Sequence, residues 1–364
     1  MAGPSPTRRH LSPAVVGRYV RASFGLRPAV VECGPLDGGG FAAVWWVRLD
    51  DGRDVVLKVA PAPHVRLLRY EQGLTAAEAR YFRLVSADLP AVPVPPVLHH
   101  GTDADLGEWL FTGRLPGRSL ADLSATGADL TRARHDVGRA VAALHRITGE
   151  HYGYADPRDD RPDPRHDRAG HEHDENARTC GGGGRACGDT WRDAFGAMVD
   201  DLLADAVDWE VPLPAPASRI RALVDRHGDA LDQVHRPALV HFDGWDGNVL
   251  AAPDATGAYR LCGLVDGERW LYGDPLLDLV SPLLFRRVED EPAHPFLRGY
   301  AHAAGVPLVL DDGARRRLAL YRMHLYLLMT VEMPSRGITR QRNPERHDRL
   351  ARLLDGELTG LADT

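Results

Sequence analysis

The stretch HFDGWDGNVL, residues 241–250, places two carboxylates and one carboxamide in a short run between apolar segments. Asp243 precedes Asn248 by five positions, and Asp266 follows the next apolar segment in CGLVDGERW, residues 262–270. A carboxylate that accepts a hydroxyl proton, an amide oxygen and a second carboxylate together suit a divalent-metal site for phosphoryl transfer. We therefore predict that Asp243 is a catalytic base and that Asn248 and Asp266 are ligands of Mg²⁺.

Each of these residues alone has a simpler interpretation, because Asp and Asn in loops are usually turn formers that bond their own backbone. Their order favours the functional interpretation. A strand, the pattern His-x-Asp-x4-Asn, two further strands and Asp-Gly follow one another here as in the catalytic and metal loops of protein kinases. We expect His241 to shape this loop by packing and hydrogen bonding rather than to act in catalysis.

A site of this kind also requires a lysine on a strand and a carboxylate on the following helix. Lys58 in VVLKVA, residues 55–60, is the only lysine of the chain and lies between apolar neighbours. An unpaired charge at such a position would be costly to bury. Its expected partner is Glu78, midway along a predicted helix, and Glu71 is the competitor about two helical turns earlier.

The first third of the chain predicts a small mixed lobe that ends near residue 115. Residues 41–60 contain two apolar runs around the turn signal Asp51-Gly52, which predicts a hairpin. A helical segment over residues 74–90 follows, three prolines in residues 91–101 end it, and residues 108–112 predict another strand. Just before the hairpin stand Gly38, Gly39 and Gly40, whose N–H groups could approach phosphates, although three such glycines also suit a plain turn.

Residues 116–364 predict a larger, mainly helical lobe that holds the catalytic loop, the metal loop and the acceptor site. Apolar residues recur at helical spacing in residues 137–147 and 191–209, and the apolar run 318–333 predicts a buried helix. Short apolar runs next to the opening motif predict strands at residues 238–242, 248–252 and 259–266. We therefore expect an α+β fold with two lobes.

Between two of the predicted helices, residues 155–189 are rich in Asp, Arg, Pro and Gly and contain few large apolar groups. This composition predicts a disordered insertion. His171, His173, Cys180 and Cys187 are residue types that bind zinc, but their spacing fits no compact zinc finger. The glycine run 181–184 favours a flexible loop instead.

The bulk composition excludes several classes of protein. A chain of 364 residues with 44% hydrophobic residues can bury a core and is long enough for two domains. The net charge of −7, without a stripe of basic residues and aromatics, argues against nucleic-acid binding. The four cysteines form no disulfide framework, and no apolar stretch approaches the roughly 20 residues of a membrane span. We expect a cytoplasmic protein that binds no membrane.

These motifs resemble the aminoglycoside phosphotransferase family, which shares a two-lobed, protein-kinase-like fold with choline and fructosamine kinases. The similarity covers nearly the whole chain and is most specific at residues 239–250 and 263–279. The resemblance implies ATP and Mg²⁺ as cofactors, with Lys58 on the α- and β-phosphates and Glu78 orienting Lys58. It also implies that Thr112, Arg114 and the neighbouring backbone, where the lobes join, meet the adenine.

Further residues match the family in a structural sense. Asp274 and Asp278 in GDPLLDL resemble its structural aspartates, and Asp274 ahead of Pro275 fits the N-cap of a helix. Asp246 lies between the base and the first metal ligand, and the sequence assigns it no role.

Two departures from protein kinases indicate a small acceptor. Trp245 stands where serine/threonine kinases usually have a lysine, and only eleven residues separate Asp266 from Asp278, which leaves no activation loop to hold a peptide. The predicted acceptor is a small hydroxylated molecule held by the helical lobe. Acidic residues that could lie near it are Glu289, Asp290, Glu291 and Glu332.

The identity of the acceptor stays open at this point. An aminoglycoside-like antibiotic, which would imply antibiotic resistance, and an amino-alcohol, sugar or glycated amine are both compatible with the motifs. The choice between ATP and GTP and the oligomeric state are open as well. An alternative is a non-catalytic, nucleotide-binding regulatory protein, against which the intact set of Lys58, Glu78, Asp243, Asn248 and Asp266 argues.

Overall fold

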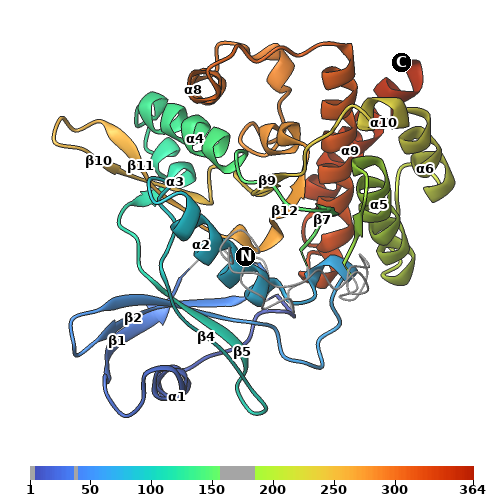
Figure 1. The fold of residues 1–364 in the computed structure, drawn as a ribbon. Helices are drawn as coiled ribbons and strands as arrows, with labels where there is room; N and C mark the ends of the chain where they lie inside the picture. The colour runs from blue at the N-terminus through green and yellow to red at the C-terminus, as the bar shows by residue number, and fades with distance from the viewer. Residues whose placement is uncertain (1–4, 37–39, 156–184) are drawn as a thin grey trace, which may run out of the picture.

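The computed structural model describes residues 5–36, 40–155 and 185–364, and it has two lobes with different architectures (Figure 1). A sheet with two helices forms the smaller lobe, and helices dominate the larger one. The fold is α+β with two lobes, as predicted. The predicted division of the chain at residue 115 stays a prediction, because the main hydrophobic core includes residues from both sides of it.

The smaller lobe is built on an antiparallel five-stranded sheet in the order β1-β2-β3-β5-β4. Its strands are β1 (Val30–Pro35), β2 (Ala43–Leu49), β3 (Asp54–Val59), β4 (Val97–Asp103) and β5 (Gly107–Gly113). Its helices are α1 (Pro13–Phe24), the 3-10 turn η1 (Arg69–Glu71) and α2 (Leu74–Asp88). The predicted hairpin, the helix that follows it and the strand at residues 108–112 are confirmed.

Side-chain alternation along β3 determines where Lys58 points. Val55, Leu57 and Val59 are buried in a separate core that the sheet shares with α1. Because successive side chains of a strand point to opposite faces, Lys58 lies on the other face, where α2 packs. The strand thus carries the lysine into the space between the two lobes.

The helical lobe follows in chain order and contains short strands between its helices. The segments from residue 118 to 231 are β6 (Arg118–Ser119), α3 (Leu120–Ser124), α4 (Thr131–Leu144), β7 (Tyr152–Gly153), β8 (Cys187–Gly188), α5 (Trp191–Asp208), α6 (Ala217–Arg226) and α7 (Gly228–Leu231). The central segments are β9 (Ala238–Val240), β10 (Val249–Pro253), β11 (Tyr259–Leu264), η2 (Gly267–Arg269), β12 (Leu271–Gly273), η3 (Pro275–Leu279) and η4 (Val288–Asp290). The last helices are α8 (Pro295–Ala304), α9 (Asp312–Ser335) and α10 (Pro344–Asp363).

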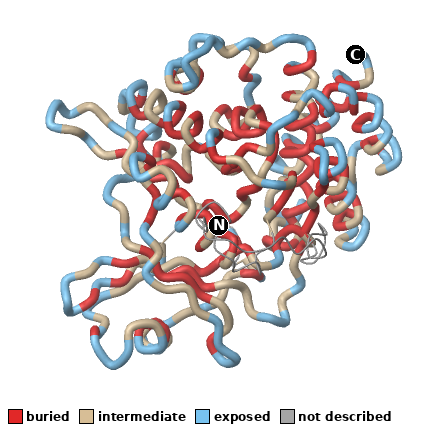
Figure 2. Tube along the Cα trace, in the orientation of Figure 1, coloured by how far each residue is buried: buried red, intermediate tan, exposed pale blue. Residues whose placement is uncertain are grey.

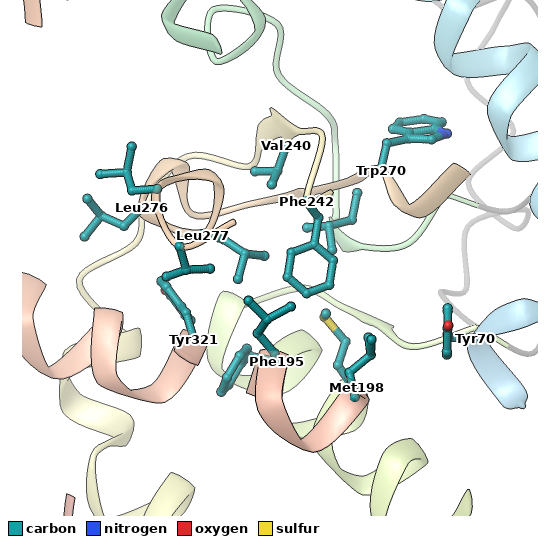
Figure 3. Close-up of a cluster of buried hydrophobic side chains, with 14 of the residues drawn as sticks. Tyr70, Phe195, Met198, Val240, Phe242, Trp270, Leu276, Leu277 and Tyr321 are labelled. Carbon is teal, nitrogen blue, oxygen red and sulfur yellow. The ribbon is translucent and has the colours of Figure 1, made fainter. Parts of the chain in front are cut away.

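Buried residues line the inside of the helical lobe, and exposed residues lie mainly on its outer turns (Figure 2). Phe242 contacts the region of α5 and α9, where Phe195, Met198 and Tyr321 are buried (Figure 3). Trp191 donates a hydrogen bond to the Tyr321 hydroxyl at 2.7 Å, so the polar atoms of these buried rings are satisfied. The predicted helix over residues 318–333 is confirmed as the buried part of α9.

Glycines let α4 and α8 approach closely. A Cβ atom added to Gly138 would lie 2.0 Å from the Phe296 carbonyl oxygen, and one added to Gly299 would lie 1.9 Å from the His135 carbonyl oxygen. Neither position could hold a larger residue without moving backbone. This contact fixes α4, whose two ends hold the catalytic loop, as described below.

Several elements were missed or wrongly predicted from sequence. The elements α1, β1 and β4 were not predicted. The ends of α1 nevertheless carry common helix-end residues, with Ser12 as the N-cap, Pro13 at the first position and Gly25 at the C-terminal end. Because the prolines of residues 91–101 stop before residue 97, they leave β4 free to pair with β5. The prediction of disorder is wrong at the end of the insertion, where Cys187–Gly188 forms β8 against β7. Residues 156–184, with His171, His173 and Cys180 of the possible zinc cluster, lie outside the described residues.

Among the helices of the described ranges, none combines the length and the apolar character needed to cross a bilayer.

Candidate active site

Lys58 lies at the centre of a buried cluster of carboxylates contributed by both lobes. Its ammonium nitrogen lies 2.8 Å from Glu78 on α2, 2.5 Å from Asp266 and 2.6 Å from Glu268 on η2. Glu71, the competing partner, instead pairs with Arg336 at 2.5 Å. The sequence-based choice of Glu78 over Glu71 therefore agrees with the geometry.

The cluster carries more negative than positive charge. Burial alone would favour the neutral amine of Lys58, but its three carboxylate neighbours raise its pKa well above the ordinary value. Burial raises the pKa of Glu78 to about 8, against the pull of Lys58, whereas Lys58 overcomes burial at Asp266 and lowers the pKa there. Even with Glu78 largely protonated, the two further acids Asp266 and Glu268 outnumber the one ammonium, so the cluster can accommodate a cationic ligand.

These acids fit a divalent cation. One oxygen from each of Glu78, Asp266 and Glu268 lies within 4.8 Å of the others. Such hard oxygen donors are the ligands that Mg²⁺ prefers, and Mg²⁺ keeps several positions for water and phosphate. Asn248 is buried near the same place: its backbone carbonyl accepts a hydrogen bond from Val265, directly before Asp266.

The catalytic loop follows β9 and is fixed by one buried carboxylate. Phe242 adopts a left-handed backbone conformation, φ 64°, which costs free energy for a residue with a side chain. Asp278 holds it by accepting hydrogen bonds from the backbone N–H groups of His241 at 2.9 Å and Phe242 at 2.7 Å. His145, at the C-terminal end of α4, contacts the same carboxylate at 3.1 Å. These contacts agree with the scaffold role predicted for Asp278.

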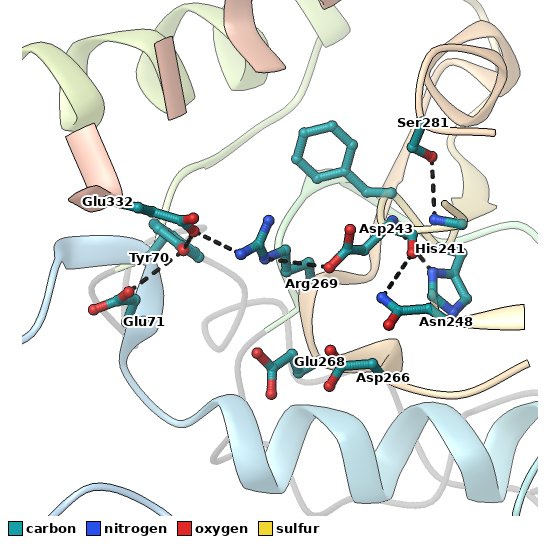
Figure 4. A network of polar contacts seen from close by, with 12 residues as sticks. Tyr70, Glu71, His241, Asp243, Asn248, Asp266, Glu268, Arg269, Ser281 and Glu332 are labelled. Atoms are coloured by element: carbon teal, nitrogen blue, oxygen red, sulfur yellow. Dashed lines mark hydrogen bonds and ion pairs between the residues drawn. The ribbon is translucent and has the colours of Figure 1, made fainter. Parts of the chain in front are cut away.

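Hydrogen bonds then orient Asp243 and its neighbours (Figure 4). The Asn248 side chain donates to the Asp243 carbonyl at 3.0 Å, and the Gly244 N–H donates to Ser281 at 3.1 Å. His241 accepts a bond from the Asp243 N–H through Nδ1 at 3.2 Å, and burial lowers the pKa of its imidazole. A neutral ring that accepts from the backbone fits the packing role predicted for His241.

Asp243 is buried beside a cation. Burial raises its pKa to about 7, and the Arg269 guanidinium, whose Nε lies 3.8 Å from its carboxylate, opposes this rise. A carboxyl group with a pKa near neutrality can exchange a proton at the working pH of most enzymes. The side-chain geometry therefore suits Asp243 to acid–base chemistry.

Other predicted residues have defined places. Gly38 and Gly39 lie outside the described residues, whereas Gly40 is described and lies near the side chain of Arg336. Thr112 is buried on β5, paired with Val56 of β3, and the Arg114 N–H donates to the Asp54 carbonyl at 3.1 Å. Contact of Thr112 and Arg114 with adenine stays a prediction.

Most of the other acidic residues singled out from the sequence bind a backbone N–H group or an arginine. Asp274 caps η3 by accepting from the Leu276 N–H at 3.0 Å, and Asp246 pairs with Arg134 near the start of α4. Glu289 pairs with Arg322 at 2.8 Å, whereas Glu332 on α9 lies within the network around Arg269.

Sequence reasoning missed Glu268 and Arg269. Both follow Asp266 within the otherwise apolar run of residues 263–272, and charges inside such a run were a signal that could have been used. Asp266 itself has a left-handed φ of 61°, and a Cβ on Gly267 would lie 2.2 Å from the Tyr81 ring. This tight turn aims Glu268 at Lys58 and Arg269 at Asp243, and nothing in residue spacing predicts it.

Comparisons with known proteins bear on the family and the fold of this chain. Residues 33–321 match the family model described as the phosphotransferase enzyme family. A search of curated protein sequences finds no match to this chain.

Solved structures share the fold at low sequence identity. A protein assigned as a fructosamine-3-kinase from Thermobifida fusca superimposes with a TM-score of 0.59 at 20% identity, covering 93% of this chain and 98% of that one. A thermostable mutant of aminoglycoside phosphotransferase APH(4)-Ia, in complex with AMP-PNP and hygromycin B, superimposes with a TM-score of 0.59 at 20% sequence identity. The match covers 96% of this chain and 99% of that one. A mutant aminoglycoside 2'-phosphotransferase-IIIa in complex with GDP has a TM-score of 0.57 at 13% sequence identity, and the match covers 96% of this chain and 98% of that one.

Proposed function

The chain belongs to the phosphotransferase enzyme family, and from this premise we propose that it transfers the γ-phosphoryl group of Mg·ATP to a hydroxyl of a small acceptor. One observation supports the proposal most strongly. The Glu78, Asp266 and Glu268 carboxyl groups surround the Lys58 ammonium. Asn248, whose side chain bonds the Asp243 carbonyl, also accepts a backbone hydrogen bond from Val265, directly before Asp266. Phosphoryl transfer needs a base and positive charge at the phosphates, which Lys58 and a divalent cation held by the neighbouring acids would supply together.

The residues of the chain have separate roles in this proposal. Lys58 binds the α- and β-phosphates, Glu78 keeps Lys58 in place, and Asn248 and Asp266 hold Mg²⁺, with Glu268 available as a further oxygen ligand. When bound, Mg²⁺ would neutralise charge on the β- and γ-phosphates. Thr112 and the backbone up to Arg114 bind the adenine.

Asp243 receives the proton of the acceptor. The acceptor oxygen forms a bond to the γ-phosphorus while the bond from that phosphorus to the bridging oxygen breaks. The bonding electrons leave with ADP, and the proton passes to the Asp243 carboxylate, from which solvent removes it after product release. Because the transition state is loose, positioning and charge neutralisation account for most of the rate enhancement.

The acceptor class follows from the short connection after the metal loop. Only eleven residues separate Asp266 from Asp278, and η2, β12 and η3 occupy them, so no segment there can hold a peptide. We propose a small hydroxylated acceptor, either an aminoglycoside-like antibiotic or an amine-bearing metabolite such as an amino-alcohol or a glycated amine. The structures similar in fold include one with hygromycin B and one assigned as a fructosamine kinase, which supports testing both classes.

A transfer screen tests the proposal. Purified protein with Mg²⁺ and ATP, and in parallel with GTP, is incubated with pools of aminoglycosides, other hydroxylated antibiotics, amino-alcohols and ketosamines. Products are detected by mass as acceptors that have gained one phosphoryl group. We expect one pool to react with wild type and not with Asp243→Asn. Mg·ATP binding without transfer to any pool would instead favour a non-catalytic nucleotide-binding regulatory protein.

A further inference from the structure

Arg269 is the one cation paired with Asp243 in the part of the chain that the structure describes (Figure 4). Its Nη2 binds Glu332 at 2.6 Å, and its Nε lies 3.8 Å from the Asp243 carboxylate. That separation is too long for a hydrogen bond. Nε is buried and has no hydrogen-bond partner among the described residues. The guanidinium therefore faces the base with one donor unused.

The far side of Arg269 is held by residues of both lobes. Glu332 on α9 accepts a hydrogen bond from the Tyr70 hydroxyl, and the guanidinium carbon of Arg269 lies 5.7 Å from the centre of the Tyr70 ring. Arg336 lies 3.6 Å from Glu332 and pairs with Glu71. Because Arg336 already neutralises part of the Glu332 charge, Arg269 retains positive charge on the side that faces Asp243.

An unused buried donor next to a catalytic base is explained if it binds an oxygen that arrives with the substrates. A buried donor without a partner costs stability, so a purely structural arginine would be expected to close the gap to Asp243. Lys58 is already surrounded by three carboxylates, and residues 241–250 contain no lysine or arginine. The acceptor side of the site therefore needs a cation from elsewhere.

We propose that Arg269 is a further catalytic residue, whose guanidinium contacts the transferred phosphoryl group from the acceptor side, opposite Lys58. The proposal rests on the phosphoryl transfer proposed above. A hydroxyl bonded to Asp243 lies roughly 2.7 Å from its carboxylate, and the phosphorus that it attacks lies on the far side of that oxygen, within reach of an arginine beside the base. The planar fork of the guanidinium suits the phosphoryl oxygens, on which charge accumulates as the bond to ADP breaks.

The chain offers a matched control for removing this arginine. Arg317 on α9 has the same side-chain exposure as Arg269, 13%, and it pairs with the buried Asp274 at 2.8 Å. Arg317→Met therefore removes a comparable buried ion pair away from Asp243. We expect Arg269→Met to lower kcat about 10³-fold, with KM for ATP and for the acceptor within about threefold of wild type. Arg269→Lys should recover part of the rate, and Arg317→Met should keep the wild-type kcat per folded molecule.

A binding measurement supplies a readout other than turnover. ADP with Mg²⁺ and aluminium fluoride imitates the planar phosphoryl group in transfer, whereas ADP alone does not. We expect Arg269→Met to bind ADP as wild type does and to lose the extra affinity that aluminium fluoride confers. The proposal is overturned if Arg269→Met has the same kcat as Arg317→Met. It is also overturned if aluminium fluoride increases the affinity of Arg269→Met for ADP as much as it does for wild type. A wild type that transfers phosphate to no acceptor would contradict the proposed function itself, so the two failures are distinct.

Discussion

At the scale of single residues, Asp243 must be ionised to accept a proton although its surroundings favour the neutral acid. Burial raises its pKa to about 7, and Arg269 opposes the rise. The grouping of Lys58 with Glu78 and Asp266, and of Asp243 with Asn248, could be predicted from sequence because each residue lies at a fixed spacing from a strand or turn. Glu268 and Arg269 could not, since the left-handed turn at Asp266 directs them.

The pH–rate profile should therefore show a change in activity near neutral pH. Since only the carboxylate form of Asp243 accepts a proton, kcat/KM for the acceptor should rise with pH and level off above about 7. Asp243→Asn should be about 10³-fold slower and lack this rise with pH. Initial rates between pH 5 and 9 measure it, and a wild-type profile that is flat from pH 5 to 8 would contradict the assigned pKa.

The same residue should reduce stability at high pH. A carboxyl group whose pKa is higher in the folded state stabilises the fold fully below its unfolded pKa of 3.8 and loses that contribution as pH rises through about 7. Asp243→Asn should thus unfold at a higher temperature than wild type at pH 8, and the difference should be smaller at pH 5. Calorimetry at the two pH values checks this, and equal differences would argue against a raised pKa.

At the scale of elements, the catalytic loop depends on contacts from η3 and α4 rather than on its own sequence. Asp278 on η3 binds the N–H groups of His241 and Phe242, and His145 at the end of α4 binds Asp278. The hairpin, α2 and α9 could be predicted because a turn signal between two apolar runs, a helical spacing and a long apolar run respectively mark them in the sequence. Short strands such as β8 could not, because they form only against partners distant in sequence.

Replacing Asp278 should loosen the loop. Asp278→Asn turns one of its two acceptors into a donor that faces a backbone N–H or His145, and it removes a buried negative charge. We expect a loss of about 2–4 kcal/mol in the free energy of unfolding, together with lower activity. Urea unfolding measures the loss. The control is Asp311→Asn at the exposed N-cap of α9, where either side chain accepts from the Ala314 N–H. Equal stability of the two variants would show that Asp278 does not support the loop.

At the scale of the whole molecule, the proposed nucleotide site is made by both lobes. Lys58 and Glu78 come from β3 and α2, whereas Asp266 and Glu268 come from the turn after β11. The overall fold could be predicted because these motifs occur in one order along the chain. The surroundings of Glu332 depend on α9 and η1 packing together, which spacing along the sequence does not reveal.

Mg·ATP should therefore stabilise the molecule as a unit. A ligand that binds only the folded state at about 100 times its Kd adds roughly 2.7 kcal/mol. We expect the unfolding temperature of wild type to rise with Mg·ATP and much less with ATP alone. Asp266→Asn should lose the dependence on Mg²⁺, and Lys58→Met should lose most of the response to nucleotide. A Lys58→Met variant that responds like wild type would remove Lys58 from the phosphate site.

The most direct test of the account is a single-turnover experiment with Mg·ATP and the acceptor identified by the screen. Wild type and Asp243→Asn are mixed with substoichiometric ATP under conditions in which both bind the nucleotide equally, and the reaction is quenched over time. We predict that wild type converts the bound ATP to ADP and phosphorylated acceptor, while Asp243→Asn retains ATP for about 10³ times longer. Equal conversion by the two proteins would contradict the assignment of Asp243 as the base of a small-molecule kinase.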